Sequence, residues 1–223
     1  MDLFNTTETI IVLDFETTGM TPENGDRAIE VGAVVLRGGE IADTFQSLIN
    51  PGFLVTREIE GITGITNDML IDAPPATEVM EKFVRFIGTY PLVAHNASFD
   101  QKFLEAELTH LGKNRPLNFG CTLQVARRLY PDVINYKLET LARYKGLPID
   151  SRLHRALADA ELAALLWRAM CTDLEKQFGF EHVDFELMKK IGRLNRDNAH
   201  ELIQKEAESS RKNPTETTGS LFG

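Results

Sequence analysis

Two carboxylates stand two residues apart at the end of an aliphatic run. Asp14 and Glu16 directly follow residues 10–13 (I-I-V-L), which are typical of a strand buried on both faces. Because side chains alternate along a strand, both acids point to one face and Phe15 to the other. Such crowded acids repel each other and lose hydration, which a fold tolerates when a hard divalent cation lies between them. Taken alone, so short a pattern favours the simpler interpretation, that both carboxylates face water.

Two further acids follow later in the chain. Asp100 comes after the short apolar run 92–94, at the start of an expected helix, where an ordinary capping role is the alternative to a chemical one. Asp159 lies five residues after His154 in H-R-A-L-A-D-A. One regular helix would place these two about 140° apart, so His154 fits the preceding loop and Asp159 the first turns. Alone, a surface histidine and a capping or surface acid are the simpler interpretation.

The elements that must position these residues follow from the hydrophobic pattern. We expect strands over residues 10–13, 28–36, 41–49, 92–94 and 118–121, with a hairpin turn at 37–40. We expect helices over about 76–87, 99–111, 122–130, 136–146 and 155–171, and mostly loop with one short helical turn over 50–73. An antiparallel meander followed by alternating strands and helices predicts an α/β fold with a mixed sheet.

Composition limits the class of protein. A chain of 223 residues that is 43% hydrophobic and 26% charged is typical of a globular protein with one substantial core. No apolar run approaches the roughly 20 residues that span a bilayer, and no secretory signal is visible, which predicts a cytoplasmic location. Cys121 and Cys171 stand outside any zinc-binding spacing, and we expect two buried thiols without a bridge.

The charge is unevenly distributed along the chain. The formal net charge is −9, with −11 in residues 1–100 and +5 in residues 101–155. An acidic portion with a carboxylate cluster, next to a basic segment, could bind a polyanion through a metal-filled site flanked by Lys and Arg. A solvated helical surface explains the basic segment equally well.

The ordered motifs resemble a known family. They are D-F-E-T-T-G at 14–19, T-G-I-T-N-D-M-L at 63–70, A-H-N-A-S-F-D at 94–100, C-T-L-Q-V-A-R-R-L-Y-P at 121–131 and H-R-A-L-A-D-A at 154–160. Each is weak alone, but in this order they resemble the DEDDh (DnaQ-like) 3′–5′ exonucleases. That family includes the proofreading exonuclease subunit of bacterial replicative DNA polymerase, exonuclease X and ribonuclease T. The resemblance implies a ribonuclease H-like fold, with a central mixed five-stranded sheet flanked by helices.

The resemblance also implies a two-metal phosphodiesterase site. Asp14, Glu16, Asp100 and Asp159 match the family's four acidic positions, which hold two divalent cations, Mg²⁺ or Mn²⁺. His154 matches the general base. Two ions about 3.5–4 Å apart can stabilise both the attacking and the leaving oxygen. An unperturbed histidine titrates near 6.5, which suits a base at neutral pH.

Substrate contacts are implied at the same end of the molecule. The residues that match the family's nucleotide-binding positions are Thr17, Thr18, Gly19, Asn96, Phe99 and, as an apolar wedge against the terminal base, Ile65. Plain core packing is the alternative for Phe99 and Ile65. We expect His95 to orient its loop through hydrogen bonds. Many relatives carry histidine at the position of Thr63, so a base contact from there is in doubt.

The domain organisation is expected as follows. Residues 1–8 form an N-terminal tail, 9–172 the exonuclease domain, 173–208 a helical extension and 209–223 a disordered tail. The tail ends in Leu221-Phe222, which faintly resembles peptides that bind the bacterial sliding clamp. A tail without function is the favoured interpretation, and a DNA polymerase or the clamp is a possible partner.

Three functions remain open. The favoured one is a metal-dependent 3′–5′ exonuclease that acts on single-stranded DNA in proofreading or repair and releases nucleoside 5′-monophosphates. The alternative is a 3′–5′ exoribonuclease in RNA maturation or decay, and no residue shows whether a 2′-hydroxyl is accepted. A non-catalytic nucleic-acid-binding or docking module would be indicated by loss of an acid or of the histidine, and all five residues are present.

Overall fold

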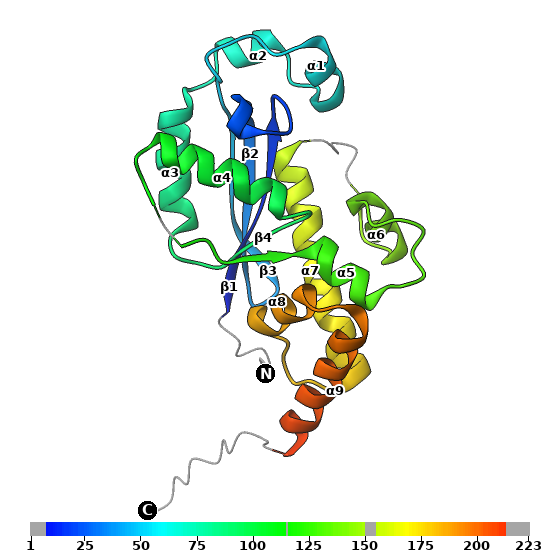
Figure 1. Cartoon of the computed structure of the whole chain (residues 1–223). Coiled ribbons are helices and arrows are strands. Elements are labelled where there is room, and N and C mark those ends of the chain that lie inside the picture. Colours follow the sequence, from blue (N-terminus) through cyan, green and yellow to red (C-terminus); the bar gives the residue numbers. More distant parts are fainter. Residues whose placement is uncertain (1–7, 115, 150–154, 213–223) are drawn as a thin grey trace, which may run out of the picture.

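A five-stranded mixed sheet forms the centre of the computed structural model, which describes residues 8–114, 116–149 and 155–212 (Figure 1). The strand order is β3-β2-β1-β4-β5. β1 (Thr9–Thr17), β2 (Ala28–Arg37) and β3 (Glu40–Leu48) form the antiparallel meander. β4 (Leu92–Ala94) and β5 (Phe119–Cys121) continue the sheet in parallel with β1. The mixed sheet expected from the sequence is confirmed.

β1 lies between two hydrophobic layers, because its alternate aliphatic side chains enter different clusters. Ile10 and Val12 pack into one cluster, and Ile11 and Leu13 pack into the other. β2 is buried along nearly its whole length, whereas β3 is a largely exposed edge strand rich in polar residues. The sheet therefore presents the end of β1 at its centre, where helices approach from both faces.

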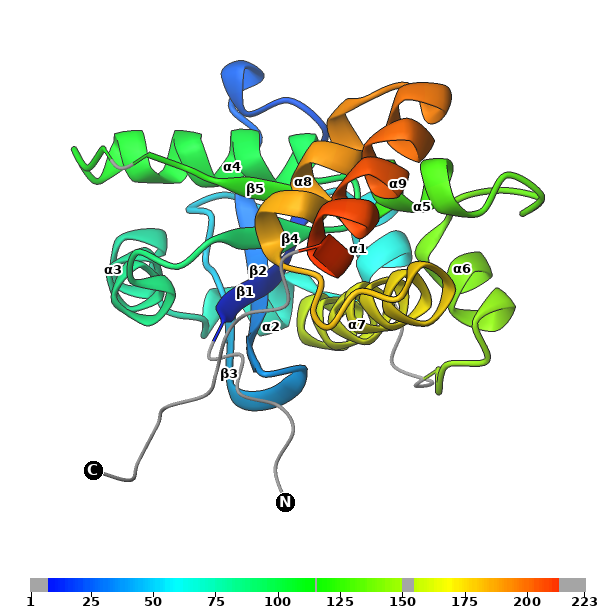
Figure 2. The same ribbon diagram turned by 90° about the horizontal axis from the view of Figure 1, so that it is seen from below.

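The helices form two layers, one on each face (Figure 2). α3 (Ala76–Ile87) and α4 (Ser98–His110) cover the face that carries Phe15. The other face packs against α7 (Ala156–Phe178), with α5 (Thr122–Leu129), α8 (Phe185–Arg193) and α9 (Arg196–Lys212) in the same cluster. α6 (Leu138–Tyr144) contributes Leu141 to that cluster. A short 3₁₀ helix, η1 (Pro22–Asn24), follows β1.

The segment 50–73 contains two short helices, and the expectation of a single helical turn is wrong. α1 (Arg57–Thr63) and α2 (Asn67–Ile71) each begin after a threonine whose hydroxyl accepts a backbone N–H bond. Thr56 accepts from Ile59, and Thr66 accepts from Met69. Each threonine is thus a normal N-cap, which was a readable signal in the sequence. In Figure 1 both helices lie at one end of the molecule.

The C-terminal helices share the core of the exonuclease region. Phe185 of α8 packs against Trp167 of α7 with 6.0 Å between ring centroids, and Ile203 of α9 is buried in the same cluster. α9 runs to Lys212, so its helix continues past residue 209, where the tail was expected. At the N-terminal end of the described chain, Glu8 accepts a 3.0 Å bond from the Phe185 N–H, which anchors residue 8 to the start of α8. The expected domain division itself stays a prediction.

Two further expectations concern cysteines and membranes. Cys121 and Cys171 are both free and partly buried, as the sequence predicted. Among the described residues, no helix combines the length and apolar character needed to cross a bilayer. The terminal residues Leu221 and Phe222, named above for a clamp contact, lie outside the described part of the chain.

Candidate active site

The last residues of β1 point to opposite faces of the sheet, as their spacing predicted. Phe15 is buried on the α3–α4 face, where its ring meets Phe83 edge-on at 5.9 Å. Asp14 and Glu16 project to the face covered by α7 and remain partly exposed. A single strand therefore delivers two carboxylates side by side, with its intervening side chain anchored in the core.

α7 brings a third carboxylate to this pair. Asp159 lies in the first turn of the helix. One carboxylate oxygen from each of Asp14, Glu16 and Asp159 lies within 4.8 Å of the other two. This spacing is what a shared cation requires, and it joins acids that are more than 140 residues apart in the sequence. The interpretation that these acids simply face water is not supported.

Asp100 lies beside this cluster but has a different environment. It is 1% exposed, in the first turn of α4, and its Oδ1 accepts a 3.1 Å bond from the backbone N–H of Phe15. The N-cap of α4 is Ala97, which makes no side-chain capping bond. Asp100 therefore connects α4 to β1 between Asp14 and Glu16, and its carboxylate also accepts a bond from its own backbone N–H at the start of α4.

The acidic groups disturb one another strongly. Burial, followed by the charges of Asp159, Glu30 and Asp100, raises the pKa of Glu16 to about 8. Burial also raises the pKa of Asp100 to about 8, against the lowering effect of the Phe15 N–H bond. The pKa of Asp14 lies well above its ordinary value because of burial and the charges of Asp100, Glu16 and Asp159. Without a cation, ionisation of these groups therefore destabilises the folded protein.

The donor set fits hard divalent cations. The three clustered acids and neighbouring Asp100 offer carboxylate oxygens only, which Mg²⁺ and Mn²⁺ prefer over the thiolate or imidazole ligands of zinc sites. Positive charge at this position would relieve the repulsion that, together with burial, raises the pKa values of Asp14 and Glu16. The cluster is thus both geometrically and electrostatically suited to bind divalent metal.

The raised pKa values predict how the stability of the metal-free protein depends on pH. A carboxyl whose pKa is raised in the folded state binds its proton more tightly there than in the unfolded chain. The free energy of unfolding therefore falls as pH rises from about 4.5 through about 8. We expect the Tm in EDTA to fall by several degrees between pH 6 and pH 8.5, since each kcal/mol corresponds to roughly 2–4 °C here.

Two controls separate this effect from other titrations. Saturating Mn²⁺ should raise the Tm more at pH 8.5 than at pH 6, and Asp14→Asn should flatten the profile in EDTA. A Tm in EDTA that stays level or rises over this range would contradict the raised pKa values.

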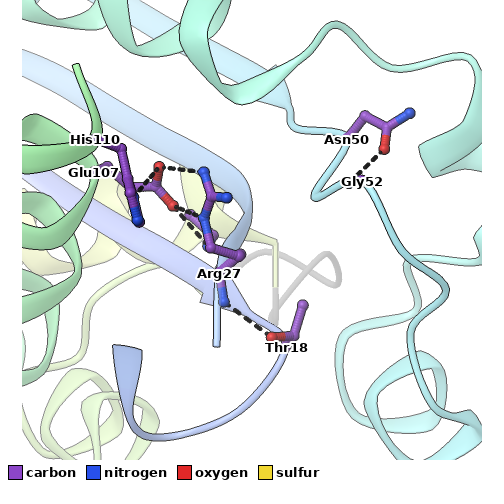
Figure 3. A network of polar contacts seen from close by, with 7 residues as sticks. Thr18, Arg27, Asn50, Gly52, Glu107 and His110 are labelled. Atoms are coloured by element: carbon purple, nitrogen blue, oxygen red, sulfur yellow. Dashed lines mark hydrogen bonds and ion pairs between the residues drawn. The ribbon is translucent and has the colours of Figure 1, made fainter. Parts of the chain in front are cut away.

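Two buried ion pairs dock helices onto the beginning of β2. The first joins Arg27 to Glu107 of α4 through two 2.8 Å bonds, Nε to Oε1 and Nη2 to Oε2 (Figure 3). Glu107 is 2% exposed, and His110 Nδ1 lies 3.8 Å from its Oε2. The second joins Glu30 to Arg155 of α7. Neither pair was predicted from the sequence, although a glutamate inside the apolar strand 28–36 is a signal of a buried partner.

The turn after β1 is tied down by its own side chains. The Thr17 hydroxyl donates to the Gly19 carbonyl at 2.6 Å, and the Thr18 hydroxyl accepts from the Arg27 N–H at 3.0 Å. Gly19 lies so close to the carboxylate of Asp26 that a Cβ atom there would force this side chain to move. The segment proposed to hold the terminal nucleotide is thus ordered next to Glu16.

The other proposed substrate residues are placed differently. Asn96 is exposed with φ of 65°, a left-handed conformation that marks a constrained loop. Phe99 is half-buried, 4.9 Å from the Phe103 ring between centroids, with Lys102 Nζ 5.4 Å from its own centroid. Ile65 has no exposed surface and packs in a small core with Ile29. Core packing, the alternative considered for Ile65, therefore describes its surroundings, and the wedge assignment stays a prediction.

His95 orients its loop, as expected. Its Nδ1 lies 2.8 Å from the Thr122 hydroxyl and its Nε2 lies 2.9 Å from the Tyr136 carbonyl. Burial lowers the pKa of His95 to about 4, so the ring is neutral at pH 7. A neutral ring satisfies both contacts when Nε2–H donates to the carbonyl and Nδ1 accepts from the hydroxyl. His154, the residue assigned as base, lies outside the described residues.

Comparisons with known proteins agree with this geometry. The exonuclease family model RNase_T matches residues 11–167. The chain belongs to this exonuclease family. The match includes Asp14, Glu16, Asp100, His154 and Asp159, and the resemblance to DEDDh exonucleases is confirmed.

Relatives by sequence are DNA polymerases. A "DNA polymerase III PolC-type" from Bacillus cereus is 40% identical over 178 residues, covering 79% of this chain and 12% of the polymerase. The protein of the same name from Bacillus subtilis is 39% identical over 193 residues, covering 84% and 13%. This RNase_T family member thus spans about an eighth of the length of the curated relatives it matches.

Solved structures of nucleases share the fold. Exonuclease X in complex with 5′ overhanging duplex DNA has a TM-score of 0.64 at 26% identity, covering 82% of this chain and 99% of that chain. The nuclease domain of 3′hExo, a DEDDh family member bound to rAMP, has a TM-score of 0.64 at 25% identity, covering 76% and 94%. The ribonuclease H-like fold implied by the motifs is confirmed, and the chain is a nuclease-type hydrolase by family and fold.

Proposed function

We propose that this chain is a metal-dependent 3′–5′ exonuclease that hydrolyses terminal phosphodiester bonds of single-stranded DNA. The observation that carries the proposal is the meeting of Asp14, Glu16 and Asp159 within 4.8 Å, beside buried Asp100. Structural acids are normally dispersed or paired with bases, because crowding them destabilises the fold. A non-catalytic binding module would have no use for this crowding, so that alternative is the weakest.

The carboxylates would hold two divalent cations, Mg²⁺ or Mn²⁺. When bound, these ions supply Lewis-acid stabilisation of phosphate charge and make water a stronger nucleophile. Asp14, Glu16 and Asp159 are the residues that would hold them, with Asp100 alongside. The 3.1 Å bond from the Phe15 N–H to Asp100, and the docking of α4 and α7, keep these acids in place before substrate arrives.

A histidine would remove the proton from the attacking water. His154 is the proposed base, since it precedes the first turn of α7 by two residues and matches the family motif. His95 cannot serve, because both of its ring nitrogens are hydrogen-bonded and burial depresses its pKa to about 4. Attack of the water on the terminal 3′ phosphodiester would then release a nucleoside 5′-monophosphate and leave a shortened strand with a free 3′-hydroxyl.

The Thr17–Gly19 turn is the proposed binding site of the 3′-terminal nucleotide. It follows Glu16 directly, and its hydroxyl bonds leave the backbone ordered. Asn96 is exposed and Phe99 half-exposed at the start of α4, where either could meet a base or sugar. Ile65 would contribute indirectly, by supporting Ile29 and the α1–α2 segment from inside.

DNA is the favoured substrate. The PolC-type relatives at about 40% identity are DNA polymerases, and exonuclease X was solved with DNA. These likenesses support a proofreading or repair role. The second candidate, an exoribonuclease, is favoured by one observation, the rAMP bound to the 3′hExo nuclease domain.

End-labelled oligonucleotides test the proposal. Purified protein would be incubated with 3′-tailed DNA and sequence-matched RNA, labelled at the 5′ end, in Mg²⁺, Mn²⁺ or EDTA. We expect a ladder of strands shortened from the 3′ end, release of 5′-monophosphates, dependence on metal, and faster degradation of DNA. Faster degradation of RNA would favour the second candidate, and products that shorten from the 5′ end would overturn both.

A further inference from the structure

Glu30 occupies an unusual position for a carboxylate. It has no exposed surface, and on β2 it stands directly opposite Glu16 in the strand register. A charge at this position repels the proposed metal ligands, and it contributes to the raised pKa of Glu16. Hydrophobic residues of similar volume would be less costly for folding here. The retention of a buried acid next to the site therefore needs a reason other than stability.

Within the described part of the chain, the Glu30 carboxylate accepts hydrogen bonds from the start of α7 and from the neighbouring strand. Oε1 accepts from Arg155 Nη2 at 2.7 Å and from Gln46 Nε2 at 2.9 Å. Oε2 accepts from Arg155 Nε at 3.0 Å and from the backbone N–H of Ala156 at 3.1 Å. A bidentate guanidinium interaction combined with a backbone hydrogen bond fixes both the orientation of the start of α7 and its distance from Glu30.

Arg155 connects this anchor to the catalytic cluster. Its side chain binds Glu30, and its carbonyl accepts the Asp159 N–H at 3.1 Å. The residue immediately before it in the sequence is His154. A single residue thus joins the buried carboxylate to the third metal ligand on one side and to the proposed base on the other.

Gly32 provides a second point of contact on the same strand. It stands opposite Asp14 in the register, and a Cβ atom added to it would overlap the backbone of Ala156 and Leu157. The first turn of α7 is therefore in close contact with β2, at the level of the two acids of β1. Glu30 and Gly32 together define the distance between α7 and β2 and the rotation of α7 about its axis.

We propose that Glu30 and Arg155 form a positioning pair that sets the first turn of α7, and with it Asp159, against Asp14 and Glu16. The inference rests on the proposed exonuclease function. Neither residue is assigned to the metal or the substrate; both act through the residues that they hold. Displacement of a reacting group by about 1 Å can cost roughly 10² in rate, so small shifts of this turn should be visible in turnover.

Conservative variants test the pair without leaving a buried charge unpaired. Arg155→Lys keeps the charge but removes the two-pronged geometry, and Glu30→Gln keeps the shape and some hydrogen bonds. We expect kcat for DNA to fall about 10–100-fold in each, with KM changed less than about threefold. We also expect the Mn²⁺ dissociation constant, measured by calorimetric titration without substrate, to rise about tenfold. The kcat of the double variant should lie within about twofold of that of the less active single variant, because the two residues act as a unit.

Arg168→Lys is the matched control. Arg168 is on the same helix and docks it to the β2–β3 turn, through Nη1 bonds to the Gly39 carbonyl (3.0 Å) and Glu40 (2.8 Å). We expect its kcat and Mn²⁺ affinity to stay within about twofold of wild type. If Glu30→Gln does not fold, Arg155→Lys decides alone, since the Arg155 side chain is 35% exposed and a lysine there can be solvated.

The outcomes distinguish the two proposals. An inactive wild-type protein with normal Mn²⁺ binding would overturn the exonuclease function. An active wild type, with folded variants that keep kcat and Mn²⁺ affinity while only the Tm falls, would show that the pair is merely structural and would overturn this inference.

Discussion

Asp14→Asn is expected to lower the rate of metal-dependent cleavage by at least about 10³ while the protein stays folded. Asp14 stands between Asp100, Glu16 and Asp159, so it contributes charge to the whole cluster. An amide of the same shape cannot offset the charge of divalent cations, and each 1.36 kcal/mol of lost transition-state stabilisation corresponds to a tenfold loss of rate. Initial rates on labelled DNA in saturating Mg²⁺ measure the effect.

Asp14→Asn should increase the stability of the metal-free protein, although it lowers activity. Removing Asp14's charge relieves repulsion, so we expect a higher Tm than wild type in EDTA at pH 8 and a smaller increase on addition of Mn²⁺. Asp43→Asn, on the exposed edge strand β3, is the control and should behave as wild type. Retained cleavage by a folded Asp14→Asn protein would remove Asp14 from the site.

His154→Ala is expected to lower turnover by about 10²–10⁴ and to leave Mn²⁺ affinity largely intact. The physical reason is that proton removal from the attacking water would lose its base, whereas the carboxylates that hold the metal would be unchanged. The pH–rate profile provides a further readout. The fall in kcat on the acidic side, expected near the ordinary histidine pKa of about 6.5, should disappear in the variant.

His200→Ala is the control for this change. His200 lies on α9 and contacts Gln204 at 2.9 Å, and it is exposed. Its loss should leave both kcat and the pH–rate profile unchanged. An unchanged rate for His154→Ala would instead transfer the role of base to another group or to solvent.

Local sequence rules predicted the part of the site that lies on one strand. The aliphatic run before Asp14 identified β1, and the alternation of side chains placed Asp14 and Glu16 on one face. Helical geometry also placed Asp159 in the first turn of its helix, which the structure confirms. In each case a regular backbone period converts spacing in the sequence into direction in space.

Other features could not be predicted, because they depend on contacts between distant segments. Glu30 is an acid within an apolar strand, which the sequence analysis did not single out, and its partner Arg155 is 125 residues away. The burial of Ile65 follows from the packing of the α1–α2 segment on Ile29, which no local pattern specifies. That Asp100 would bind the N–H of Phe15 likewise depends on how α4 meets β1.

The central claim is that the clustered carboxylates hold divalent metal for phosphodiester cleavage. Crystals soaked in Mn²⁺ and a nucleoside 5′-monophosphate, with anomalous diffraction collected at the manganese edge, test it most directly. We predict two peaks about 3.5–4 Å apart, bounded by Asp14, Glu16 and Asp159, with the phosphate of the nucleotide between them and the turn after β1. Anomalous peaks elsewhere, with none at these carboxylates despite saturating Mn²⁺, would contradict the account.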